Sequence, residues 1–65
     1  MNITTRMKQI DGVTNAAYNF DAMTLAIYYK ATANLELLKI RVAKEIGTAM
    51  LQNAIPTINF YSEEP

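Results

Sequence analysis

The chain has 65 residues, 51% of them hydrophobic, and its six basic and six acidic residues cancel. A domain of this size buries only roughly 60% of the surface that its unfolded chain exposes, so it usually needs disulfides, a metal or oligomerisation for stability. The sequence contains no Cys and no His, which excludes disulfides and the common zinc-ligand sets. We therefore expect the additional support to come from other protein chains.

Residues 1–20 are predicted to form a short N-terminal helix with a turn. The Asp11-Gly12 pair is typical of a turn or a helix stop. Apolar residues recur at helical spacing on both sides of this pair, namely Ile3, Met7 and Ile10 before it and Val13, Ala16, Ala17 and Phe20 after it.

Residues 21–53 are predicted to form one long helix, which would measure about 50 Å at 1.5 Å per residue. Asn19 or Asp21 supplies a side-chain oxygen for the N-cap. Pro56 ends the helix because a proline disfavours the helical conformation of the residue before it. Residues 54–65 are predicted to be an extended tail, in which residues 57–60 alternate polar and apolar side chains like a strand.

The predicted long helix has apolar residues on two separate sides. At about 100° per residue, the first side carries Ile27, Leu35, Leu38, Val42 and Ile46, and the second carries Leu37, Ile40 and Leu51. A helix with two apolar sides needs two neighbours, and the N-terminal segment has too few large side chains to cover both. We therefore predict an all-α fold, a helical hairpin or bundle formed by oligomerisation, with these residues as the interface.

The sequence offers few side chains for chemistry. Without His or Cys, and with Ser62 as its only Ser, it does not supply a nucleophile with an adjacent base. We predict no enzyme activity, no cofactor and no metal site. Lys30, Arg41 and Lys44 share a side of the helix, but tyrosines lie near Lys30 only, so a nucleic-acid ligand is disfavoured.

No stretch of the sequence is long and apolar enough to cross a bilayer, so we expect no transmembrane segment. Residues 1–10 lack the apolar run of a signal peptide. We expect a protein made in the cytoplasm, with any export needing no cleaved signal.

Parts of the sequence resemble known families of assembly proteins. The opening Met1-Asn2-Ile3, the Ala22-Met23 pair, Leu37-Leu38-Lys39 and residues 44–51 resemble the small motility proteins of flagellated bacteria. The interval from Lys39 to Gly47 is shorter than in that family, and Arg41 replaces its usual Asp. Residues 35–41 are similar to the C-terminal helices of axial and inner-rod proteins of flagella and type III secretion systems. Both resemblances imply a structural, assembly-forming role without catalysis, and neither carries a functional residue across.

We therefore predict a non-catalytic structural protein that forms a homo-oligomer or joins a larger protein assembly, with a connection to motility or secretion. Two alternatives stay open. The chain can be a small regulatory adaptor, of the phage or plasmid type, whose helix binds in a groove of a partner protein. It can also be a nucleic-acid binder, whose affinity would fall steeply with salt.

Overall fold

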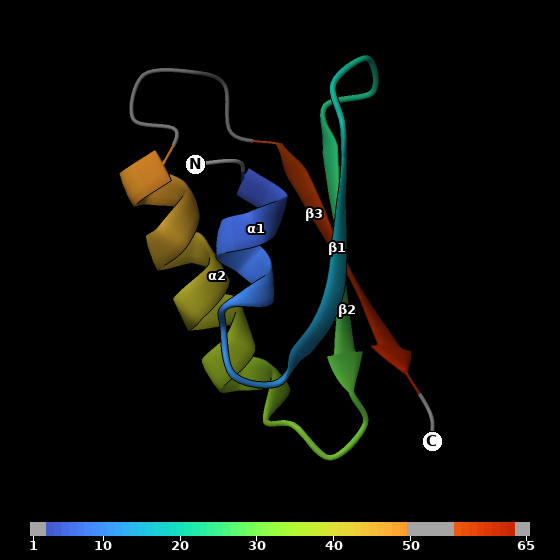
Figure 1. Cartoon of the computed structure of the whole chain (residues 1–65), viewed down its shortest axis with the longest axis vertical. Helices are drawn as coiled ribbons and strands as arrows, with labels where there is room; N and C mark the ends of the chain where they lie inside the picture. The colour runs from blue at the N-terminus through green and yellow to red at the C-terminus, as the bar shows by residue number, and fades with distance from the viewer. Residues whose placement is uncertain (1–2, 50–55, 64–65) are drawn as a thin grey trace.

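A computed structural model describes residues 3–49 and 56–63, and it has a mixed α/β fold. Its elements are α1 (Ile3–Lys8), β1 (Val13–Asn19), β2 (Thr24–Lys30), α2 (Leu35–Ala49) and β3 (Thr57–Glu63). The strands form one sheet in the order β1-β2-β3, with β1 antiparallel and β3 parallel to β2. Both helices lie on the same face of this sheet (Figure 1).

The predicted all-α fold is therefore wrong, and so is the helix over residues 21–53. The first part of that predicted helix is the strand β2, in which Leu25 and Ile27, two positions apart, are both fully buried. This alternation, with the β-branched and aromatic residues of Thr24–Lys30, favours a half-buried strand. The residues 13–19 that continued the helical spacing form β1 and pair with β2 as a hairpin.

The start of α2 corrects the predicted N-cap. The side-chain oxygen of Asn34 accepts a hydrogen bond from the backbone N–H of Leu37 at 3.2 Å, so Asn34 caps α2. Asn19, one of the two predicted caps with Asp21, accepts a similar bond from the N–H of Ala22 at 3.0 Å, but in the loop between β1 and β2. The same side-chain bond can begin a helix or stabilise a turn, which is why the sequence alone did not separate the two.

The hydrophobic core lies between the sheet and the two helices. Its buried residues come from the α1 region, β1, β2 and α2: Met7, Ile10, Ala16, Leu25, Ile27, Leu38, Val42 and Ile46. From β3, Ile58 and Phe60 pack against this cluster. One apolar side of α2 is thus covered by the sheet of the same chain and needs no second copy.

Gly12 allows the loop between α1 and β1 to pass close to the start of α2. Its φ angle is +97°, a left-handed conformation that favours glycine. A Cβ on this residue would lie 3.2 Å from the Cβ of Ala33 and 3.4 Å from Cδ2 of Leu38. Gly47, near the end of α2, differs, because a Cβ there would meet nothing within 4 Å.

The two glycines predict stability changes of opposite sign. Gly12→Ala should lower the free energy of unfolding by about 1–3 kcal/mol, because it combines a strained φ angle with a tight contact. Gly47→Ala should raise it by up to about 1 kcal/mol, because alanine has the higher helix propensity and space is open. Urea unfolding followed by circular dichroism measures both, and a change of the same sign in the two variants would contradict the fold described here.

Candidate functional site

The outer side of α2 exposes large hydrophobic residues. Ile40 is 65% exposed and Leu37 is 52% exposed. At about 100° per residue, Ile40 lies about 160° around the helix from the buried Leu38, so it faces away from the core. Large apolar side chains that gather on a surface mark candidate interaction sites.

Leu37 and Ile40 form part of a groove of about 710 Å³ between α1 and α2. We call it the α1–α2 groove, and its lining residues are Arg6, Gln9, Ile10, Asp11, Leu37, Ile40, Arg41, Lys44 and Glu45. The lining therefore combines apolar side chains of α2 with a rim of charged and amide side chains from the two helices and from the loop after α1. This combination suits a protein segment that has both an apolar and a charged part.

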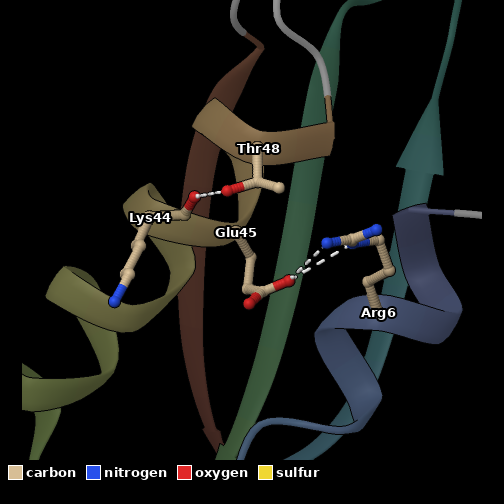
Figure 2. A network of polar contacts seen from close by, with 4 residues as sticks. All are labelled: Arg6, Lys44, Glu45 and Thr48. Carbon is tan, nitrogen blue, oxygen red and sulfur yellow. Dashed lines mark hydrogen bonds and ion pairs between the residues drawn. The ribbon is translucent and has the colours of Figure 1, made fainter.

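An ion pair joins the two walls of the groove. The Nε and Nη2 atoms of Arg6 on α1 each lie 3.2 Å from Oε1 of Glu45 on α2 (Figure 2). Figure 2 also shows the Lys44 side chain extending away from this pair, while its backbone carbonyl accepts a hydrogen bond from the Thr48 hydroxyl. Glu45 thus pairs with Arg6. Among the described residues it forms no ion pair with Arg41, which lies one helical turn before it.

The remaining charges make the rim of the groove slightly positive. Within the described part of the chain, Arg41, Lys44 and Asp11 form no ion pair. Two cations against one carboxylate leave a net charge of one positive unit. An occupant with a carboxylate next to an apolar side chain would match this rim.

The structure separates the residues that the sequence predicted as an interface. Ile27, Leu38, Val42 and Ile46 are buried in the core of one chain, with Ile27 on β2 and the others on α2. Leu35 is half-buried at the start of α2. Leu37 and Ile40 are exposed and lie together in the α1–α2 groove. Leu51 lies outside the described residues.

Sequence reasoning missed a second surface, the face of the sheet opposite the helices. Tyr28 of β2 and Tyr61 of β3 are register partners there, and their rings stack with centroids 5.4 Å apart. The Thr14 hydroxyl of β1 donates a hydrogen bond to the Glu63 carboxylate of β3. The sequence signals for this surface were the alternation along residues 24–30 and the alternation along residues 57–60. A polar sheet face of this kind is commonly solvated, so the α1–α2 groove is the stronger candidate.

The basic residues are arranged poorly for nucleic acid. Lys30 and Arg41 line a smaller hollow of about 290 Å³ beside the start of α2. The stacked Tyr28 and Tyr61 lie on the other face of the sheet, so bases stacked on them would not reach Arg41 or Lys44 on the helical side. No group of three or more acidic residues among those described is placed to hold a metal ion.

Comparison of the chain with protein-family models, curated proteins and solved structures found no match. The resemblance to motility and rod proteins therefore stays a prediction. Across residues 3–49 and 56–63, no helix is long and apolar enough to cross a membrane.

The ion pair across the groove predicts a measurable coupling. Replacing Arg6, Glu45 and both by Ala should give a coupling energy of roughly 0.2–1 kcal/mol, because both side chains are partly exposed. High salt should reduce it by screening. The matched control is the cycle between Lys39 and Glu45, which lie six positions apart on α2 and form no ion pair among the described residues, so their coupling should be near zero; equal coupling in the two cycles would contradict the pairing described here. Urea unfolding of the four chains in each cycle supplies the energies.

Proposed function

We propose that this protein is a non-catalytic assembly protein that associates with further copies of itself through the α1–α2 groove. The observation that supports it best is the pair of exposed side chains, Leu37 at 52% and Ile40 at 65%, inside one groove. The chain covers the other apolar side of α2 with its own sheet. The outer side has no such cover among the described residues.

The groove supports a weak association. Burying the exposed parts of Leu37 and Ile40 contributes on the order of 1–2 kcal/mol each, at about 25 cal/mol per Å². Association costs at least about 4 kcal/mol in lost translational and rotational freedom. Since these two side chains only about offset that cost, the other contacts across the groove must supply the net affinity, and we expect a weak, transient association with a dissociation constant of roughly 0.1–1 mM.

The positive rim also supports the adaptor hypothesis, in which an acidic, partly apolar segment of a different protein fills the same groove. The two hypotheses differ in what the purified chain does alone. An assembly protein associates with itself as its concentration rises, whereas an adaptor stays monomeric until its target is added.

Substitution of Ile40 tests the proposed function. Sedimentation of the wild-type chain from about 10 µM to 1 mM should show a concentration-dependent increase in mass. Ile40→Asp should abolish that increase, because it places a carboxylate in the apolar part of the groove lining. Since Ile40 is exposed, the variant should unfold within about 0.5 kcal/mol of wild type.

Ala43→Asp is the matched control, because it adds the same charge to an exposed position of α2 that does not line the groove. It should associate as wild type does. A wild-type chain that stays monomeric at 1 mM would overturn self-association and leave the adaptor hypothesis.

A further inference from the structure

The self-association proposed above leaves open which surface of the second copy enters the groove. We propose that the loop between β1 and β2, residues 20–23, fills it, and we call this loop the hairpin tip. Phe20 of one copy packs on Leu37 and Ile40 of the next copy, and Asp21 faces Arg41 and Lys44. This inference rests on the proposed function and adds the partner surface to it.

The hairpin tip presents an aromatic ring to solvent. Phe20 is 77% exposed, the largest exposed fraction among the large hydrophobic residues that the structure describes. Its ring centroid lies 4.8 Å from that of Tyr18, which supports it from one side. The hydrogen bond from the Ala22 N–H to the Asn19 side chain restrains the loop, which lowers the conformational entropy that docking would cost.

The tip and the groove are complementary in charge and polarity. In the tip, a carboxylate on the exposed Asp21 follows directly after the apolar ring. In the groove, the exposed apolar residues Leu37 and Ile40 lie beside the cations Arg41 and Lys44. The charges on Arg41 and Lys44 have no ion-pair partner within the described part of the chain. Tyr61 is the one exposed large hydrophobic residue of the described chain that lies outside both the tip and the groove. Its ring already stacks on Tyr28, so it is a weaker candidate for the groove than Phe20.

The two surfaces lie apart on the molecule. Figure 1 shows the hairpin loop at one end of the long axis, beyond both of the helices that line the groove. A chain cannot fill its own groove with its own tip, so the contact joins two copies. Since the two surfaces differ, the contact is heterologous and repeats head to tail. Each added copy lengthens the particle by up to the long dimension of the molecule, 35 Å.

Two variants that each lose one surface test this arrangement. Phe20→Ser removes the ring from the tip and Ile40→Asp blocks the groove, and each variant alone should raise the dissociation constant of self-association by roughly tenfold or more. Mixed together, they should form a one-to-one dimer, because the Ile40→Asp chain still has its tip and the Phe20→Ser chain still has its groove. Phe20→Leu, which keeps an apolar tip, should associate as wild type does within about threefold.

Nuclear magnetic resonance at millimolar concentration identifies the surfaces. When the Phe20→Ser chain is ¹⁵N-labelled and the unlabelled Ile40→Asp chain is added, the amides of residues 37–44 should shift. With the labels reversed, the amides of residues 20–23 should shift. No shift in either direction would overturn the inference. If Phe20→Ser associates as wild type does while Ile40→Asp does not, the tip is excluded as the occupant but self-association through the groove stands.

A charge exchange gives an independent readout. Asp21→Lys and Arg41→Glu should each weaken self-association by roughly threefold to tenfold, because each places like charges in contact. An equimolar mixture should recover wild-type association, since each tip then meets a groove of opposite charge. A mixture no stronger than either variant alone would overturn the assigned contact between Asp21 and the cationic rim.

Discussion

The packing of α2 on the sheet determines which surfaces this protein presents. Leu38, Val42 and Ile46 recur every four residues along one side of α2 and join Leu25 and Ile27 in a single buried cluster. Each of these side chains contributes on the order of 1.5–3 kcal/mol when it is fully buried, so rotation of α2 about its axis would cost several kcal/mol. Because the rotation is fixed, Ile40 on the opposite side of the helix must face outward.

The α1–α2 groove follows from the unequal lengths of the two helices. α1 has six residues and α2 has 15, which correspond to about 9 Å and 22 Å at 1.5 Å per residue. α1 therefore covers less than half of the side of α2 that it contacts. Met7 anchors α1 in the core, and the Arg6–Glu45 pair joins α1 to α2.

Three local patterns in the sequence correspond to features of the structure. They are the Asp11-Gly12 turn, the alternation after Pro56 and the two apolar sides of residues 35–46. The strands β1 and β2 were missed because Ala16, Leu25 and Ile27 fit helical spacing as well as strand alternation. Short apolar runs are ambiguous in this way, and pairing between β1 and β2 decides the outcome, which is a non-local interaction.

The candidate site could be predicted only in part, for a related reason. The helical pattern alone predicts Leu37 and Ile40 as interface residues, and both lie in the candidate groove. Their separation from Leu38 and Val42, which the chain buries itself, depends on a sheet that the pattern did not reveal. Arg6 and Glu45 are 39 positions apart in the sequence, so no local spacing rule connects them. The helical spacing predicts a helix at Phe20, and a helix does not indicate that this side chain is exposed in a loop between two strands.

The arrangement of one tip and one groove also connects the two hypotheses about function. In a head-to-tail contact, every row of copies ends with one unfilled groove and one free tip. A weak contact makes the length of such a row depend on protein concentration. Another protein that presents an aromatic side chain beside a carboxylate would fill the terminal groove and stop growth. Self-assembly and binding of a regulatory partner would then compete for the same few side chains, Leu37, Ile40, Arg41 and Lys44.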